Sequence, residues 1–310
     1  MELDDYLTDF QRLKVNKKGD HESPHKPCML LAVIGLAEAG QLEDNKIRFT
    51  HALLDRYFEI FSVVKTESDH ANPYFPYFHL KSENFWYLQP LQGREAVLAA
   101  LDSARTYAAV EENIDYAYLD SKLYDYLLNA ESRFMLRDTL ITRWFGAFSA
   151  QLHKLVSQDA YESNLRQIIA TGEIAETAAS FDKPTRDTAF RRIVTEAYDY
   201  RCAATGMRIV LPGELIMVEA AHLIPFSDTQ DDDPRNGIAL TPDLHWALDR
   251  NIIAPGPDLK WHVSKLVDSR IADNLPLIEL DGKEILLPRD KRYWPRDHAL
   301  ARRLSELRRV

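Results

Sequence analysis

Apolar and polar positions divide the first half of this chain into short helical and strand-like segments. Residues 28–40 form an almost continuous apolar run, typical of a buried helix, and Gly40 is expected to end it. Ser23 or a neighbouring residue is expected to cap the start of that helix. The pattern also predicts helices over residues 53–64 and 133–156 and short strands over residues 46–50 and 84–88.

The second half shows a strand followed by a helix. Residues 215–218 are an apolar, strand-like run, and Pro225 stops further strand pairing a few residues later. The helix is expected to begin with Thr241 as its N-cap and Pro242 in its first position.

A polar, alanine-rich stretch separates the two halves. Residues 159–180 have this composition and contain Gly172, and residues 182–185 resemble a turn. We therefore expect an α+β protein in which a helical linker joins a mainly helical, mixed α/β domain to a second domain. The predicted boundaries are 1–155 for the first domain, 156–185 for the linker and 186–310 for the second domain.

Composition and charge narrow the class of protein. With 310 residues, 45% of them hydrophobic and 28% charged, the chain is an ordinary globular protein long enough for two cores. Its net charge of -10 argues against a protein that coats nucleic acid through a uniformly basic surface. DNA binding remains compatible with this charge, because only the contacting face must be positive.

Arginine is concentrated at the end of the chain. Pro295 is expected to open a last helix there. Its arginines are either a phosphate-contacting surface or a solvated basic helix end that favours the helix dipole. The apolar stripe of this helix is Leu300, Leu304 and Leu307, and the arginines are those at positions 302, 303, 308 and 309.

The apolar runs, the N-terminus and the cysteines predict where the protein is located and whether it holds structural zinc. No apolar run reaches membrane-spanning length, and the acidic N-terminus lacks the features of a signal peptide. The two cysteines, Cys28 and Cys202, fit a reducing cytoplasm, so a cytoplasmic protein is expected. Because neither cysteine belongs to a C-x-x-C pair, no structural zinc is expected.

The candidate chemistry lies in three short segments of the second half. His222, Asn236 and His245 stand in V-E-A-A-H-L-I-P-F, P-R-N-G-I-A-L and L-H-W-A-L-D. Hydrolysis of a phosphodiester needs an activated water, for which histidine is a suitable general base, and a divalent cation to stabilise the developing charge. Asp249 follows His245 by four residues, so on a helix both side chains point to one face and could bind one cation.

Residues 198–253 resemble the HNH, or ββα-metal, endonuclease superfamily. The resemblance implies that His222 is the general base, that Asn236 holds the loop and orients the base, and that His245 binds Mg²⁺ or Mn²⁺. Many members carry a metal ligand immediately before the base, where this chain has Ala221. Asp249 is the first candidate to replace that ligand and Glu219 the second. Three residues after His245 are expected to pack in the core, namely Trp246, Ala247 and Leu248.

The first half carries a second resemblance, over about residues 10–145. The segments P-H-K-P-C-M-L-L and Y-F-P-Y-F-H-L resemble the sulfur-binding domain of phosphorothioate-dependent restriction endonucleases. In such domains a basic residue beside a histidine contacts the backbone, and an aromatic–proline pair with a small residue forms an apolar cup for sulfur. By position, these DNA-binding and sulfur-binding residues are His25, Lys26, Phe75, Pro76 and His79.

The chain departs from that family in three places. Lys26 stands where some members have arginine, Phe75 replaces a tyrosine, and the bulky His79 occupies the place of the small residue. The aromatic residues of 74–78 could alternatively form only a core turn.

Together the two resemblances predict a defence endonuclease. It would recognise phosphorothioate-modified double-stranded DNA, cut a nearby phosphodiester with a divalent metal ion and restrict the modified DNA. Cutting both strands suggests a homodimer, which would supply two active sites. Two alternatives stay open: an HNH restriction endonuclease specific for methylated or otherwise modified bases, and a non-catalytic protein that binds modified DNA.

Overall fold

The chain folds into two compact units, each with its own apolar core. Unit 1 is Met1–Ser163, and unit 2 comprises residues 164–211 and 215–309. Helices dominate, and each sheet in the described part of the chain is two-stranded and antiparallel, so the α+β prediction is confirmed. The computed structural model describes residues 1–19, 21–42, 44–171, 183–211 and 215–309.

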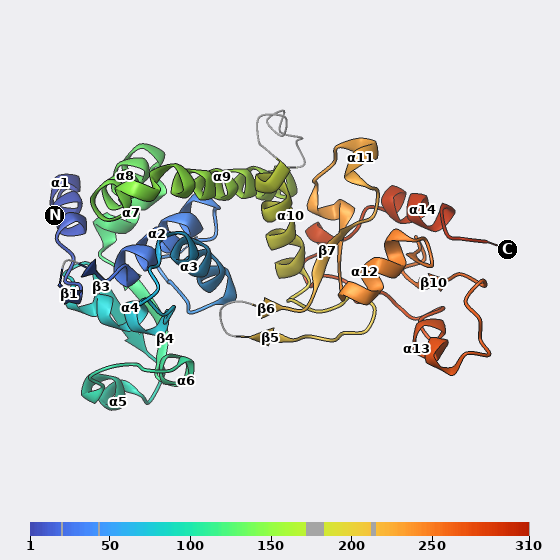
Figure 1. Cartoon of the computed structure of the whole chain (residues 1–310), viewed down its shortest axis with the longest axis horizontal. Coiled ribbons are helices and arrows are strands. Elements are labelled where there is room, and N and C mark those ends of the chain that lie inside the picture. The colour runs from blue at the N-terminus through green and yellow to red at the C-terminus, as the bar shows by residue number, and fades with distance from the viewer. Residues whose placement is uncertain (20, 43, 172–182, 212–214, 310) are drawn as a thin grey trace. The chain divides into compact units, whose positions relative to one another are not determined.

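Unit 1 is mainly helical, with three pairs of short strands or bridges between its helices (Figure 1). Its elements are α1 (Leu3–Gln11), β1 (Lys17–Lys18), β2 (His21–Glu22), α2 (His25–Glu38), α3 (His51–Val64), α4 (Tyr74–His79), β3 (Trp86–Pro90), α5 (Glu95–Ala100), α6 (Tyr107–Glu111), β4 (Ile114–Leu119), α7 (Ser121–Leu128), α8 (Ala130–Phe145) and most of α9 (Ser149–Thr171).

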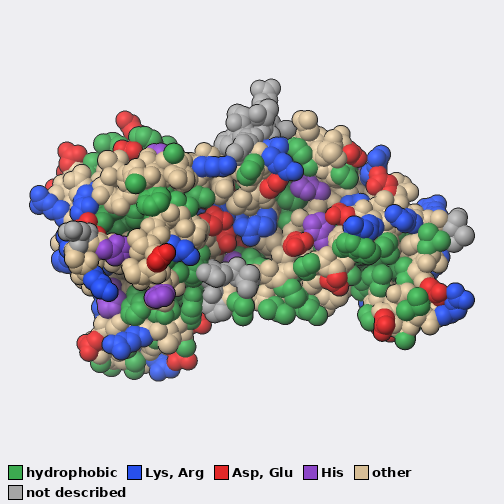
Figure 2. Space-filling model, viewed as in Figure 1, with side chains coloured by type: hydrophobic (Ala, Val, Ile, Leu, Met, Phe, Trp, Pro, Cys, Tyr) green, Lys and Arg blue, Asp and Glu red, His purple; other side chains and the backbone are tan. Residues whose placement is uncertain are grey.

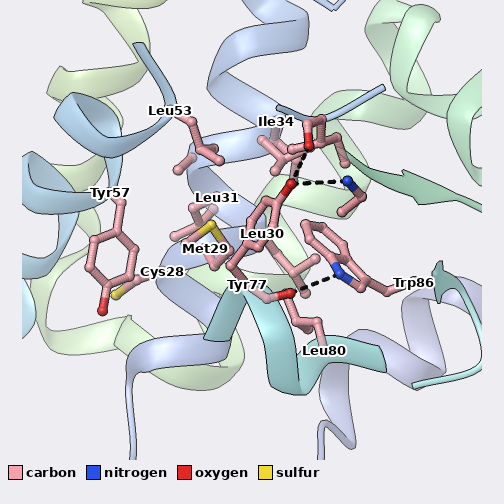
Figure 3. Close-up of a cluster of buried hydrophobic side chains, with 14 of the residues drawn as sticks. Cys28, Met29, Leu30, Leu31, Ile34, Leu53, Tyr57, Tyr77, Leu80 and Trp86 are labelled. Atoms are coloured by element: carbon pink, nitrogen blue, oxygen red, sulfur yellow. Dashed lines mark hydrogen bonds between the residues drawn. The ribbon is translucent and has the colours of Figure 1, made fainter. Parts of the chain in front are cut away.

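Helix α2 is the centre of the core of unit 1. It is buried on all sides, from Lys26 to Ala37, which explains why its sequence lacks a polar face. Tyr77 lies beside it and joins separate segments, as Figure 3 shows. Its hydroxyl donates to the carbonyl of Ile47 at 2.6 Å and accepts from the amide of Ala117 at 2.9 Å. Trp86 donates to the carbonyl of Tyr77 at 3.0 Å, so the polar side-chain groups of Tyr77 and Trp86 are satisfied within the core.

Several elements of unit 1 differ from the prediction. The helix predicted from residue 28 begins at His25, and Ser23 does not cap it, because its hydroxyl bonds to the ring of His25 instead. Gly40 follows the helix with a φ of 70°, as a helix-ending glycine should. The predicted strand at 46–50 is only a single bridge between Ile47 and Ala117.

Three further predictions in unit 1 concern element boundaries. The helix predicted over 53–64 is confirmed as α3. The strand predicted over 84–88 begins two residues later, as β3. The single helix predicted over 133–156 is interrupted by a 3₁₀ turn at Gly146–Phe148, which separates α8 from α9.

Unit 2 contains a hairpin and helices that pack on it (Figure 1). Its elements are α10 (Lys183–Ala197), β5 (Val210–Leu211), β6 (Leu215–Ile216), β7 (Glu219–His222), α11 (Phe226–Thr229), β8 (Gly237–Leu240), α12 (Pro242–Asp249), β9 (Ile253–Pro255), β10 (Trp261–Val263), α13 (Leu275–Ile278) and α14 (Asp297–Ser305).

Strands β7 and β8 with helix α12 form a ββα arrangement. The strands pair antiparallel, with Glu219 opposite Leu240 and His222 opposite Gly237. Helices α10 and α12 both pack against this pair. The predicted start of α12 is confirmed, with Thr241 at the N-cap and proline in the first turn. His222 is the last residue of β7, which confirms the predicted strand end.

The division between the units lies inside α9, at Ser163. In unit 1 the first part of this helix is anchored by a buried arginine of α3. Arg56 donates from Nε to Asp159 at 2.9 Å and from Nη2 to Glu162 at 2.7 Å. Both acidic residues fall in the predicted linker 156–185, of which residues 172–182 lie outside the described part of the chain. The boundaries predicted from the sequence stay a prediction.

The surface carries both signs of charge. Acidic and basic side chains are interspersed over the face shown in Figure 2. Among the described residues, no helix is both long enough and apolar enough to cross a membrane.

Candidate functional site

The predicted base, His222, is held by two contacts at the end of β7. Its ring stacks on Phe190 of α10 at a centroid distance of 3.9 Å and an interplanar angle of 2°. Its Nε2 lies 3.3 Å from Oδ1 of the buried Asp232. If Nε2 carries the proton, Nε2 donates a hydrogen bond to Asp232, and Nδ1 keeps a lone pair. This tautomer is the one that can take a proton from a water molecule.

Asn236 holds the loop between β7 and β8. It is 1% exposed, and its side-chain oxygen accepts from the amide of Ile224 at 2.9 Å. Its amide nitrogen donates to the carbonyls of Ile224 at 2.9 Å and Asp231 at 3.1 Å. Asn236 therefore fixes the backbone that follows His222, while Asp232 is the side chain that contacts the imidazole ring.

The predicted metal ligand, His245, lies on α12 between two carboxylates. Its Nδ1 is 2.7 Å from Glu219, and its Nε2 is 3.6 Å from Asp249. Glu219, ranked second from the sequence, is thus the nearer of the two. All three side chains are accessible to solvent, His245 at 26%, and each carboxylate at more than half.

These donors are chemically suitable for a divalent cation. Imidazole nitrogen and carboxylate oxygen together are common ligands of Mn²⁺, and carboxylate oxygens of Mg²⁺. Among the described residues, however, no three His, Cys, Asp or Glu side chains are already arranged around one point. Glu219 is hydrogen-bonded to Nδ1 of His245, whereas Asp249 lies beyond hydrogen-bond distance of Nε2, so a cation bound at Nδ1 would have to replace the contact with Glu219.

Two expectations about unit 2 are wrong. Trp246 does not pack in the core: it is 52% exposed, and the guanidinium of Arg250 lies 4.4 Å from its ring centroid. Ala247 and Leu248 are buried, as expected. Arg303 belongs neither to a phosphate-contacting surface nor to a solvated helix end, because its side chain is only 3% exposed.

The five residues predicted to bind DNA or sulfur line one cavity of about 500 Å³ in unit 1. Two come from the start of α2, and three come from α4. The rings of Phe75 and His79 stack at 6.0 Å, with an interplanar angle of 22°, and Pro76 of the same helix is buried. The segment therefore forms a helix with one face toward a cavity. The five residues are His25, Lys26, Phe75, Pro76 and His79.

His25 is fixed in one tautomer by its neighbours. Its Nε2 donates to the carbonyl of His70 at 2.8 Å, so its Nδ1 accepts from the hydroxyl of Ser23 at 2.8 Å. Burial lowers the pKa of His25, which keeps the ring neutral at physiological pH. Burial also lowers the pKa of His79, with Lys26 and Lys81 adding to the effect. His25 and His79 thus present neutral imidazoles to the cavity.

Lys26 is buried and paired. Its Nζ donates to Glu83 at 2.5 Å and to the hydroxyl of Ser82 at 2.8 Å. Burial lowers its pKa, against the opposing effect of Glu83. An ammonium group has three N–H donors, so one remains for a further acceptor in the cavity. The charge available to a ligand there is partly neutralised by Glu83.

Sequence reasoning missed several side chains of both sites. Lys14 also lines the cavity, and its Nζ donates to the carbonyl of Ser82 at 2.9 Å. Around the base, Phe190 and Asp232 were not singled out. Asp232 lies within a run of three aspartates, so its position was visible but its role was not.

A ββα unit with a histidine at the strand end and an imidazole–carboxylate group on the helix defines the class of ββα-metal nuclease domains. Residues 202–254 match the family described as HNH endonuclease. Residues 3–157, half of the chain, match the family described as ScoMcrA-like, DNA sulfur-binding domain. The chain belongs to this sulfur-binding family and carries an HNH endonuclease domain after it.

Comparisons with whole proteins add little more. A solved structure of the modification-dependent restriction endonuclease TagI aligns with a TM-score of 0.30 and 19% sequence identity. The alignment covers 44% of this chain and 44% of that chain, so the match spans less than half of the relative's length. A search of curated protein sequences found no match.

Proposed function

We propose that this protein is a metal-dependent DNA endonuclease that recognises phosphorothioate-modified DNA through unit 1 and cuts a nearby phosphodiester in unit 2. The observation that carries the proposal is the cavity of unit 1, which brings together residues of α2 and α4 that are distant in sequence. The sulfur-binding family of residues 3–157 and the HNH family of residues 202–254 support the two roles. The biological consequence would be restriction of sulfur-modified DNA.

Sulfur would be distinguished from oxygen by the apolar wall of the cavity. A non-bridging sulfur is larger and less strongly hydrated than oxygen, so Phe75 and Pro76 offer it a favourable surface. Burying an area equivalent to one or two methylenes contributes about 1–2 kcal/mol, or roughly a tenfold preference. The remaining donor of Lys26 and the ammonium of Lys14 would contact phosphate oxygens, which adds affinity without discrimination.

Hydrolysis would use His222 as the general base. The water oxygen attacks phosphorus while one water proton passes to Nδ1 of His222, and the bond from phosphorus to the leaving oxygen breaks. Asp232 stabilises the ring in the receptive tautomer and the positive charge that then forms on it. A cation held by His245 with Glu219 or Asp249 would stabilise the charge on the phosphate and leaving oxygen.

Cutting both strands of a duplex requires two active sites or two successive events. A homodimer would supply two sites. Light scattering of the protein, alone and with a phosphorothioate duplex, tests this part of the proposal. A mass of two chains on the duplex is expected, and one chain per cut duplex would favour successive events.

Recognition is tested by binding without cleavage. Full-length His222→Ala protein is titrated with two duplexes that are identical except for one phosphorothioate step. We expect tighter binding of the sulfur-bearing duplex. Phe75→Ala in the same background should lower the ratio of the two dissociation constants by roughly tenfold. Phe134→Ala, an exposed aromatic of unit 1 outside the cavity, is the control. Equal affinities would reject sulfur recognition, and preference for a methylated, sulfur-free duplex would indicate a base reader instead.

Catalysis is tested by cleavage of the sulfur-bearing duplex with Mg²⁺ or Mn²⁺ and with a chelator. Cleavage should require the metal and should be lost in His222→Ala. His298→Ala, which alters an exposed histidine of the same unit, should cut normally. Full cleavage by His222→Ala would show that the mechanism is wrong. Binding without any cleavage by the wild type would indicate a non-catalytic protein.

A further inference from the structure

Arg303 of α14 is a buried cation that lies beside the site and beyond the residues of the HNH match. Its Nη2 donates to the carbonyl of His222 at 2.9 Å, and its Nη1 donates to Oδ1 of Asn251 at 3.0 Å. The carboxylates of Asp249 and Glu306 lie 4.0 Å and 3.9 Å from the same two nitrogens. Its Nε is buried with no partner among the described residues. Burial of a guanidinium is costly unless hydrogen bonds and nearby carboxylates compensate for the lost hydration, and here one N–H group stays without a partner.

The two residues that Arg303 binds lie at the ends of the two elements that carry the candidate chemistry. His222 is the last residue of β7, and Asn251 lies in the turn two residues after α12, the helix of His245. Asn251 has a φ of 56°, and its carbonyl accepts from the amide of Arg308 at 2.9 Å. Arg303 therefore binds the side chain of Asn251, and Arg308 binds its backbone carbonyl. Arg303 spans from this turn to the strand end that holds the base.

We infer that Arg303 is a positioning residue that fixes the distance and orientation between the base His222 and the metal-binding helix α12. The inference rests on the proposed nuclease function and extends it to a residue outside the HNH motif. Arg303 acts through the backbone of His222 and through Asn251, and burial excludes direct contact with DNA. Its charge also lies beside Asp249, so it opposes displacement of that carboxylate from the site.

The geometry requires arginine. A guanidinium is a rigid, planar fork that can donate to two acceptors in different directions at once, whereas a lysine ammonium is a point charge on a flexible stem. Arg302, the preceding residue, offers a matched contrast. Its side chain is 55% exposed and pairs with Glu306 at 2.6 Å on the surface. Substitution of Arg302 leaves in place the hydrogen bonds that Arg303 donates to His222 and to Asn251.

The test compares full-length Arg303→Lys, Arg303→Gln and Arg302→Gln proteins. Cleavage of saturating duplex should slow by about tenfold to hundredfold in both Arg303 variants, the usual effect of removing an outer partner from a metal site. The KM for DNA should stay unchanged, and Arg302→Gln should cut at the wild-type rate. Equal rates in folded Arg303 variants would overturn the inference. Asn251→Gly keeps the left-handed backbone and removes one acceptor, so it should give a smaller loss of the same kind.

A second readout does not depend on cleavage. In metal-free protein with labelled histidines, the ring signals of His222, identified by their loss in His222→Ala, should shift in Arg303→Gln and not in Arg302→Gln. Thermal unfolding shows which variants are folded. Unchanged His222 signals in folded Arg303→Gln would overturn the positioning role. If the wild type cuts no DNA but the signals shift, the nuclease proposal fails and the positioning of His222 stands.

Discussion

At the scale of single residues, Asp232 lies 3.3 Å from Nε2 of His222, and we propose that it fixes the tautomer of that ring. We expect Asp232→Asn to lower kcat by about a hundredfold, the lower end of what general-base catalysis contributes, because asparagine lacks the charge that holds Nε2–H. Single-turnover cleavage at saturating duplex measures this loss. Asp228→Asn, an exposed aspartate nearby, is the control. An unchanged kcat in Asp232→Asn would show that the base does not need this partner.

His25 makes the stability of the protein depend on pH. Burial lowers its pKa below the ordinary value of 6.5, so the unfolded chain binds the proton more readily than the folded one. The free energy of unfolding therefore falls as pH drops below about 7 toward the folded pKa, and the loss is complete once the pH is below that folded pKa. Urea unfolding should show this fall, and His25→Gln should reduce it. The same pH dependence in both proteins would contradict the assignment.

The sequence could indicate which residue types carry chemistry but not which partners hold them. His222, Asn236 and His245 were found because their spacing and neighbours match a motif. Phe190 and Arg303 could not be found in this way, because they reach the site from α10 and α14, on either side of the motif. Similarly, only the structure shows Glu219 nearer than Asp249 to His245. The roles of the predicted residues stay predictions.

At the scale of elements, the hairpin lies close against α10 because Gly237 has no side chain. A Cβ there would lie 2.5 Å from Val194 and 2.7 Å from the ring of Phe190. Gly237→Ala should lower the free energy of unfolding by about 1–3 kcal/mol, the usual cost of overpacking. Urea unfolding measures it, with Gly146→Ala as control, since a Cβ at that position meets nothing within 4 Å. Equal free energies of unfolding of the two variants would mean that α10 shifts away from the hairpin at no cost and makes room for the added Cβ.

The middle of α9 is joined to α3 by buried charges. Glu162 is 0% exposed and binds Arg56 at 2.7 Å. Glu162→Gln should lower the free energy of unfolding by about 3 kcal/mol, because Arg56 would keep a buried charge with less compensation. The exposed Glu111→Gln, also in unit 1, should cost far less in the same calorimetric measurement. A similar small change in both variants would indicate that α9 contributes little to unit 1.

Elements with strong local patterns were predictable, and elements defined by distant contacts were not. The apolar run of α2 and the Thr241–Pro242 start of α12 identify helices by local chemistry. The predicted strand at 46–50 is reduced to one bridge, because the amides of Lys46 and Thr50 bond locally to nearby carbonyls rather than to β4. The sequence also contains no sign that α9 should continue in unit 1 beyond residue 156, since the acidic partners of Arg56 look like solvated charges in a polar stretch.

At the scale of the whole molecule, recognition and cleavage are assigned to separate units. The two motifs lie in different halves of the chain, which made two domains predictable. The net charge of -10 means that the overall field does not attract DNA, so we propose that exposed local groups such as Lys14 attract it. A division of labour follows: cavity variants should change which DNA is cut, and variants of His222 should change whether it is cut.

The most direct measurement places both duplexes in one tube with the wild-type protein and Mn²⁺ or Mg²⁺. The duplexes differ in one phosphorothioate step and in their fluorescent label, so the ratio of the two cleavage rates gives the ratio of their kcat/KM values. We predict that the sulfur-bearing duplex is cut at least about tenfold faster and that Phe75→Ala brings the two rates together. Equal cutting of both duplexes by the wild type would contradict sulfur recognition and leave only the nuclease.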